Sequence, residues 1–322
     1  MSPRSRKILL KNPLGGTGIE VSRIGLGAWP IGGGFYGEVS DEEGVAVVRR
    51  YLEMGGRFID TARAYRKSER LVGRALASTP VPREEVVLST KTLENDLHGI
   101  RDSLSESLEE LRLDSVDILF LHAPPEDPAE MDEALEALRE LKKEGRIRAA
   151  GASIAGPDVT AETPALCRQY IETAKVDVLQ LIFSIARPAN REVFALAHRC
   201  GVGIVARTVL ENGFLTGKYE PGAHFAEGDQ RNRWPKEKRD AIFRLVGELS
   251  RQGFPPPYRN MAEVAARFAV DEGGVSSCIL GASRPEQANR NCEMDALPPL
   301  PYPFKNKLVH AFQKQEPLFN IE

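Results

Sequence analysis

Cysteine is scarce in this chain, and the few cysteines are scattered. They are Cys167, Cys200, Cys278 and Cys292, and no two of them form a CxxC pair. Unpaired thiols are typical of a protein kept in a reducing compartment, so we expect a cytoplasmic protein without a disulfide framework. The five histidines show no metal-ligand spacing either, and we therefore expect no bound metal.

Long apolar runs and an excess of one charge are also missing. No stretch approaches the roughly 20 apolar residues of a membrane span. The basic start, MSPRSRKILLKNP, has an apolar part of residues 8–10 only, too short for the apolar region of a signal peptide. The formal net charge of −3 provides no basic field for nucleic acid. We therefore expect neither a membrane nor a nucleic acid as a partner.

What the sequence does contain is a regular alternation of short apolar runs and amphipathic runs. The apolar runs predict strands at 21–29, 57–62, 85–91, 116–122, 147–153, 176–182, 202–208 and 276–282. The amphipathic runs predict helices at 41–54, 68–77, 98–113, 129–144, 163–174, 190–199, 261–273 and 285–294. Alternating strand–helix units imply a parallel sheet with strands buried on both faces.

Eight such units favour an α/β fold of the (β/α)8 TIM-barrel type over a doubly wound open sheet. The spacing is even and no composition shift marks a boundary, so we predict a single domain over 1–322. The Pro/Gly-rich segments 218–235 and 253–258 lie between the seventh strand and its helix. We interpret them as parts of an insertion at about 210–258, and we expect one more short helix in a tail at about 300–322.

The segment before the first unit predicts a β-hairpin. KILLKNPLGGTGIEVSRI contains two short apolar segments joined by GGTG, which is typical of a turn. We expect this hairpin, at about 7–20, to plug one end of the barrel.

Ionisable side chains follow several neighbouring strands. Asp60 ends the second strand and Tyr65 lies in the loop after it, while Lys91 ends the third strand and His122 the fourth. In TIM barrels the carboxyl ends of the strands meet at one rim and carry the functional groups. We therefore expect these four side chains to lie together.

The four residue types together suit proton transfer to a carbonyl oxygen. A free tyrosine has a pKa near 10, and a nearby ammonium lowers it, so we expect Lys91 to make Tyr65 more acidic. Asp60 would keep Lys91 charged, and His122 would hydrogen-bond the substrate oxygen. Taken singly, these side chains also fit a helix cap, a packing aromatic, a solvated lysine and a core histidine. Their combination favours catalysis.

These segments resemble the motifs of the aldo-keto reductases. FIDTARAY, LSTK and DILFLH are similar to the family's segments around its catalytic Asp, Tyr, Lys and His, and the resemblance extends from GTGIEVSRIGLGAWPIGG to LGASRPEQANRN. It implies a barrel that binds a nicotinamide cofactor, usually NADPH, and reduces a small-molecule carbonyl. Tyr65 would be the general acid, tuned by Asp60 and Lys91, and His122 would orient the carbonyl.

The resemblance also implies a site for the nicotinamide. Ser153 and Gln180 match the residues that hold the carboxamide, but Ile154 replaces the usual asparagine. Arg207 stands where an aromatic side chain usually stacks on the nicotinamide. A guanidinium can stack on a ring as well, or alternatively reach a phosphate. Gly27, in the loop after the first strand, is expected to line the pocket.

Two further segments resemble the parts of the family that bind the rest of the cofactor. LENGFLTGKY (210–219) is similar to the pyrophosphate segment, with Leu215 and Lys218 as contact residues. GASRPEQANRN is similar to the adenosine-phosphate segment, whose matching residues are Gly281, Ser283, Arg284, Gln287, Arg290 and Asn291. Arg284 and Arg290 near a helix N-terminus favour a 2′-phosphate, and hence NADPH over NADH.

The substrate stays open at this point, and an aldehyde, a ketone or a sugar lactol all fit. Trp29, Phe35, Trp234 and Tyr258 are candidates for lining its pocket, and Arg66 stands where the family commonly has a glycine. Two other functions stay open as well. One is a cofactor-binding regulatory subunit with slow turnover, and the other is a lyase that forms a Schiff base on a lysine.

Overall fold

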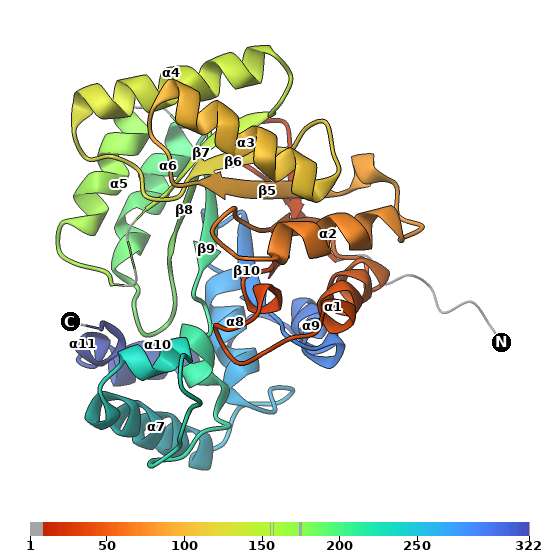
Figure 1. Cartoon of the computed structure of the whole chain (residues 1–322). Coiled ribbons are helices and arrows are strands. Elements are labelled where there is room, and N and C mark those ends of the chain that lie inside the picture. Colours follow the sequence, from red (N-terminus) through yellow and green to blue (C-terminus); the bar gives the residue numbers. More distant parts are fainter. Residues whose placement is uncertain (1–8, 155, 157, 174–175, 322) are drawn as a thin grey trace.

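Eight parallel strands close into a barrel, as the alternation of apolar and amphipathic runs predicts (Figure 1). The computed structural model describes residues 9–154, 156, 158–173 and 176–321. The strands, in chain order, are β3 (Ile24–Gly27), β4 (Phe58–Asp60), β5 (Val87–Thr92), β6 (Ile118–Leu121), β7 (Ala149–Ser153), β8 (Val178–Ile182), β9 (Gly203–Arg207) and β10 (Ser277–Gly281). Each pairs with the next, and β10 pairs with β3 to close the ring. The predicted TIM barrel is confirmed.

Eight helices follow the strands at the predicted places. They are α1 (Asp41–Glu53), α2 (Ser68–Ala77), α3 (Leu97–Leu111), α4 (Pro128–Lys143), α5 (Thr163–Glu172), α6 (Phe194–Arg199), α8 (Met261–Val270) and α9 (Pro285–Glu293). Local caps define several starts. Ser40 and Glu43 form a capping box on α1, and the side chains of Asp96, Asp127 and Asn260 accept backbone hydrogen bonds at the starts of α3, α4 and α8. Within the described residues, no helix is both long and apolar enough to cross a bilayer.

A two-stranded antiparallel sheet precedes the barrel and fills its amino-terminal end. It consists of β1 (Lys11–Pro13) and β2 (Glu20–Ser22). Leu14, Ile19 and Val21 from this hairpin are buried in one apolar cluster with inward-facing residues of the barrel strands, such as Phe58 and Val178. The predicted hairpin plug is therefore present, although its second strand ends slightly later than expected.

The alternation of side chains along each strand decides which groups reach the site. Along β5, Val87 belongs to the apolar cluster inside the barrel, whereas Leu88 packs in the outer cluster with the helices. Because side chains on a strand alternate between two faces, Ser89 and Lys91 lie on the same inner face as Val87, nearer the carboxyl end. The interior is thus apolar near the amino-terminal ends of the strands and polar near their carboxyl ends.

The segment between β9 and α8 contains a helix that was not predicted from the sequence. Pro/Gly-rich stretches on both sides suggested an irregular insertion, but α7 (Lys236–Arg251) lies between them. Its buried residues, Ile242, Phe243, Val246 and Leu249, repeat with a helical period that the sequence did display. The tail forms α10 (Tyr302–Phe312) and α11 (Glu316–Phe319) rather than one short helix, and α11 packs on α7 beside the barrel (Figure 1).

Candidate active site

A cavity of about 1160 Å³ opens at the carboxyl ends of the barrel strands. It is larger than the roughly 300–1,000 Å³ of a typical small-molecule pocket. Its wall takes residues from both halves of the barrel, among them Gly27, Asp60, Ser153, Gln180, Arg207 and Gly281. The cavity therefore has room for more than one small ligand, and most of the predicted residues line it.

A buried ion pair lies at the edge of the cavity, which Asp60 lines. Lys91 is fully buried, and its Nζ donates hydrogen bonds to Asp60 Oδ2 at 2.6 Å and to the Thr61 carbonyl at 2.8 Å. Burial by itself would lower the pKa of Lys91, but the Asp60 carboxylate and the Tyr65 phenol outweigh burial and raise it. Lys91 consequently stays an ammonium at neutral pH.

Tyr65 lies above this ammonium and borders the cavity. The Lys91 Nζ is 4.8 Å from the centroid of the Tyr65 ring. Burial raises the pKa of Tyr65, and Lys91 opposes this rise without cancelling it. Lys91 thus acts on the pKa of Tyr65 in the direction we expected, but the loss of hydration on burial outweighs it and the net pKa is raised. Tyr65 carries its proton at neutral pH.

His122 stands next to Tyr65 at the end of β6. The two ring centroids are 5.5 Å apart in an edge-to-face arrangement. Burial, with help from the positive charges of Lys91 and Arg207, lowers the pKa of His122 to about 3. The imidazole is thus neutral, and its buried Nδ1 finds no hydrogen-bond partner among the described residues. A neutral imidazole keeps one N–H to offer to a ligand oxygen.

The two residues expected to hold a carboxamide are linked to the ion pair. Ser153 Oγ donates to Gln180 Oε1 at 3.3 Å, and Gln180 Nε2 donates to Asp60 Oδ1 at 2.8 Å. Both residues line the cavity, whereas Ile154, which replaces the usual asparagine, is fully buried. The chain of hydrogen bonds from Ser153 to Lys91 was not anticipated from the sequence.

Arg207, at the end of β9, lines the cavity on the same side. Its Nη2 donates to the carbonyl oxygens of Ile154 at 3.3 Å and Gly156 at 2.9 Å, so it ties β9 to the loop after β7. Burial lowers the pKa of Arg207 to about 10, which still leaves the guanidinium charged at neutral pH.

The far end of the cavity is formed by the start of α9 and the loop before it. Ser283 donates to Gln287 Oε1 from both its backbone N and its Oγ, at 2.7 and 3.1 Å. Asn291 Nδ2 donates to the Gly281 carbonyl at 3.1 Å. Arg284 and Arg290 are exposed, and all six residues predicted in this segment line the cavity.

The loop that follows β9, residues 208–219 and here named the β9 loop, forms a side wall. Lys218 is exposed and lines the cavity, with its Nζ 4.7 Å from the centroid of the Tyr219 ring. Leu215 is fully buried in the apolar core and is absent from the cavity wall. It lies on the side of the loop that packs inward, away from the cavity where we expected it to contact a ligand.

Aromatic side chains surround the catalytic end of the cavity. The Trp29 ring lies 4.9 Å from the Phe35 ring and 6.2 Å from the Tyr65 ring, and both Trp29 and Phe35 line the cavity. Trp234 also borders it, although only 4% of this residue is exposed and its Nε1 donates to the Phe319 carbonyl. Tyr258 is buried outside the wall, so its prediction was wrong.

The residue after Tyr65 does adopt the conformation that glycine favours. Arg66 has φ of 52°, and its guanidinium lies 5.0 Å over the Phe35 ring. A cation over an aromatic face is attracted by the ring quadrupole, which offsets part of the backbone cost.

Several residues that contact the predicted groups were missed in the sequence. Ser89 Oγ donates to Asp60 Oδ1 at 2.8 Å, and its position two residues before Lys91 on β5 was a usable signal. Tyr36 donates from its hydroxyl to Asn212 Oδ1 at 2.6 Å, which joins the loop after β3 to the β9 loop. That contact spans 176 residues and has no sequence signature. Among the described residues, no group of three or more His, Cys, Asp or Glu side chains could hold a metal ion.

Comparisons with known proteins agree with this geometry. A family model described as Aldo/keto reductase family matches residues 23–302. The chain is 30% identical to an NADH-specific methylglyoxal reductase of Escherichia coli, covering 87% of this chain and 92% of the relative. It is 29% identical to an L-galactose dehydrogenase of Arabidopsis thaliana, covering 86% and 85%.

Solved structures of similar proteins also superpose on this chain. A glycerol dehydrogenase of Gluconobacter oxydans superposes with a TM-score of 0.75 at 26% identity, over 95% of each chain. The holo form of an aldo-keto reductase from Bacillus halodurans superposes with a TM-score of 0.74 at 24% identity, over 95% of this chain and 96% of the other, which supports the fold. The family model, the relatives and the superpositions together lead to one conclusion: this chain belongs to the aldo/keto reductase family.

Proposed function

We propose that this protein reduces an aldehyde or ketone, using hydride from a nicotinamide cofactor and a proton from Tyr65. The observation that carries the proposal is the buried Lys91–Asp60 pair beneath a protonated Tyr65, with a neutral His122 at its side. When bound, the cofactor supplies the hydride that the carbonyl carbon accepts.

Side chains of the protein would bind and protonate the carbonyl oxygen of the substrate. Tyr65 and His122 would both hydrogen-bond the carbonyl oxygen, which polarises it before it becomes negative. Tyr65 would then hand its phenolic proton to that oxygen. The Lys91 ammonium would stabilise the tyrosinate left behind, and Asp60 would keep Lys91 charged in its buried position.

The state of Lys91 argues against a Schiff-base lyase. An amine must be unprotonated to attack a carbonyl, but the raised pKa of Lys91 holds it as an ammonium. Its Nζ is also occupied by hydrogen bonds to Asp60 and to the Thr61 carbonyl. We therefore do not retain this alternative.

For the cofactor we propose NADPH in preference to NADH. Two exposed arginines, Arg284 and Arg290, line the far end of the cavity at the start of α9 and within it. A helix N-terminus and a guanidinium both favour a phosphate, as on the 2′ position of NADPH. One relative is named an NADH-specific reductase, so the two cofactors must be compared directly. We further propose that Gly27, Ser153, Gln180, Arg207 and Lys218 contact the nicotinamide and the pyrophosphate.

For the substrate we propose a small polar carbonyl compound. Trp29 and Phe35 restrict the catalytic end of the cavity, while Tyr65 and His122 provide its polar groups. Relatives named for methylglyoxal, L-galactose and glycerol support a small oxygenated substrate.

A panel of aldehydes, ketones and sugars tests this proposal, with cofactor consumption followed by absorbance in parallel reactions with NADPH and NADH. We expect turnover with small oxygenated carbonyl compounds and a higher kcat/KM for NADPH. Tight cofactor binding without turnover of any compound would reject the enzyme and favour a regulatory cofactor-binding subunit. A higher kcat/KM for NADH would reject the cofactor preference alone.

A further inference from the structure

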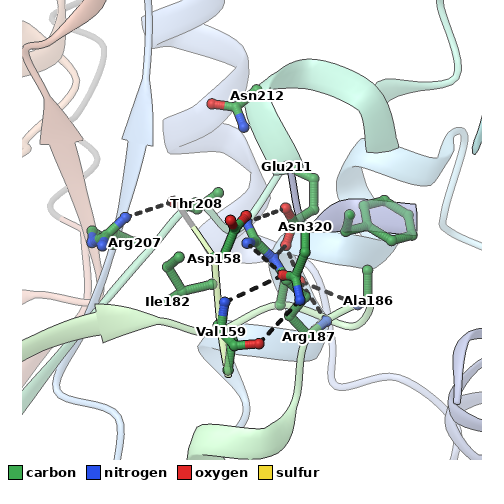
Figure 2. A network of polar contacts seen from close by, with 12 residues as sticks. Asp158, Val159, Ile182, Ala186, Arg187, Arg207, Thr208, Glu211, Asn212 and Asn320 are labelled. Carbon is green, nitrogen blue, oxygen red and sulfur yellow. Dashed lines mark hydrogen bonds and ion pairs between the residues drawn. The ribbon is translucent and has the colours of Figure 1, made fainter. Parts of the chain in front are cut away.

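The β9 loop has a backbone that needs support. Thr208, Glu211 and Asn212 have φ values of 60°, 46° and 55°, in the left-handed region that favours glycine. Such conformations persist in other residues only where surrounding contacts enforce them, and they often occur at functional sites. Here a buried polar network behind the loop provides these contacts (Figure 2).

The centre of that network is an ion pair with almost no exposure to solvent. Arg187, from the loop after β8, donates from Nη2 to Glu211 Oε2 at 2.6 Å and from Nε to Glu211 Oε1 at 3.1 Å. Ser184 Oγ donates to the same Oε1 at 2.5 Å. The side chains of Arg187 and Glu211 are 0% and 1% exposed, so the pair is desolvated and its geometry is fixed by forked hydrogen bonds.

The carboxy-terminal segment adds a second attachment. Arg187 Nη1 donates to Asn320 Oδ1 at 3.4 Å. Asn320 also pairs with the loop after β7, since its Oδ1 accepts from the Val159 backbone N at 3.2 Å and its Nδ2 donates to the Val159 carbonyl at 3.0 Å. Figure 2 shows Asn320 between Val159 and the Arg187–Glu211 pair. One amide side chain thus connects the loop after β7 to Arg187 in the loop after β8, and through Arg187 to Glu211 in the β9 loop.

Asn212, the residue after Glu211 in the β9 loop, faces the cavity instead of the buried network. Glu211 does not line the cavity, whereas Asn212 does, and Asn212 Oδ1 accepts a hydrogen bond from the Tyr36 hydroxyl at 2.6 Å. In Figure 2, Asn212 projects away from the network into which Glu211 points. Thr208 and Gly213 also line the cavity. Anchoring residue 211 from behind therefore fixes which groups of the loop face a ligand.

We propose that Glu211, Arg187 and Asn320 are positioning residues for the cofactor. By holding the β9 loop in its left-handed conformation, they preorganise the wall against which a nicotinamide dinucleotide binds, so that cofactor affinity depends on a side chain near the carboxy-terminal end of the chain. This inference rests on the proposed function, because it assigns the cavity to such a cofactor. None of the three residues transfers a proton or a hydride.

Two isosteric or small substitutions test the proposal, with a matched control. Glu211→Gln removes the charge of the ion pair without changing its shape, and Asn320→Ala removes the link between the loops. The control is Asp117→Asn, which removes another buried carboxylate bound by two arginines, Arg83 and Arg148, immediately before β6 and therefore at the opposite end of the barrel. The full-length variants are titrated with NADPH, followed by quenching of tryptophan fluorescence, and their melting temperatures and kcat are measured.

We expect the apparent Kd for NADPH to rise about tenfold in Glu211→Gln and about threefold in Asn320→Ala, because the apparent Kd rises as the populated fraction of the binding-competent loop falls. Asp117→Asn should lower the melting temperature and leave the Kd unchanged. In Glu211→Gln, kcat at saturating cofactor should fall less than twofold. An unchanged Kd in both loop variants, with melting temperatures lowered as in Asp117→Asn, would overturn the proposal and leave the ion pair a purely structural one.

A comparison at Arg187, which also borders the cavity, tests the other partner of the ion pair while Glu211 stays unchanged. Arg187→Lys keeps the charge but loses the forked contact, so its Kd should lie between those of the wild type and Arg187→Met. Equal Kd values for Arg187→Lys and Arg187→Met would contradict a positioning role of the Arg187 charge. Failure of the underlying function is distinguishable, because the wild-type protein would then not bind NADPH or NADH at all.

Discussion

Replacing Lys91 by methionine is the perturbation whose outcome the structure constrains most closely. Methionine keeps much of the apolar stem but removes the ammonium that lies 2.6 Å from Asp60 Oδ2. The exposed fractions of the two side chains are 0% and 2%, so Asp60 would be left as a buried charge without its partner. Breaking a buried pair in this way costs about 3–5 kcal/mol.

The remaining hydrogen bonds place the cost at the lower end of that range. In Lys91→Met, Asp60 Oδ1 still accepts from Ser89 Oγ and Gln180 Nε2. We therefore expect a loss of about 3 kcal/mol in the free energy of unfolding. With an unfolding entropy of about 2.1 cal/mol/K per residue over 322 residues, this corresponds to a fall in melting temperature of about 4–5 °C.

The double variant Asp60→Asn/Lys91→Met separates stability from catalysis. Removing both charges relieves the unpaired carboxylate, so the double variant should melt at a higher temperature than Lys91→Met. Its kcat should stay low, by about 10²–10⁴-fold relative to the wild type, because the tyrosinate still lacks its cation. Calorimetry and cofactor oxidation under saturating substrate measure the two quantities. A Lys91→Met variant as stable as the wild type, or a double variant that regains activity, would refute this reasoning.

Three further predictions follow from other parts of the site. The pKa of His122 is lowered to about 3 and that of Tyr65 is raised. The rate of carbonyl reduction should therefore stay flat between about pH 5 and 9 and fall only as Tyr65 loses its proton in alkaline solution. A pH profile of kcat that drops below about pH 7 would contradict this. Arg284→Ala should raise the KM for NADPH about tenfold while changing the KM for NADH less than twofold, and equal effects on both cofactors would reject a 2′-phosphate contact. Gly151→Ala should destabilise the protein by about 1–3 kcal/mol in denaturant unfolding, because the added Cβ would lie 2.4 Å from a ring carbon of Phe120, and wild-type stability would contradict that packing.

The sequence was sufficient to predict most of the barrel because local patterns and the fold agree there. Each apolar run is buried on both faces and each following helix has its own cap or periodicity, as in α1 with Ser40 and Glu43. The rim residues Asp60, Lys91 and His122 were identifiable because a parallel barrel brings the ends of its strands together. In α7 the periodicity was present, but the flanking Pro/Gly-rich stretches obscured it.

What the sequence could not reveal depends on contacts between distant segments. The direction of the net pKa shift of Tyr65 depends on how much protein surrounds the phenol, which no local motif encodes. The bond from Arg187 to Asn320 joins residues 133 positions apart, and the inward direction of Leu215 follows from the kinked path of the β9 loop. Burial and long-range pairing of this kind require the folded structure.

The role of Tyr65 is tested most directly by single-turnover measurements on Tyr65→Phe with bound NADPH. This substitution removes only the hydroxyl, so the ring should still pack beside His122 and the cofactor should bind with wild-type affinity. We predict that reduction of a good carbonyl substrate becomes at least about 10²-fold slower, as expected when a general acid is lost. A variant that binds the cofactor normally and still reduces the substrate at the wild-type rate would show that another group donates the proton.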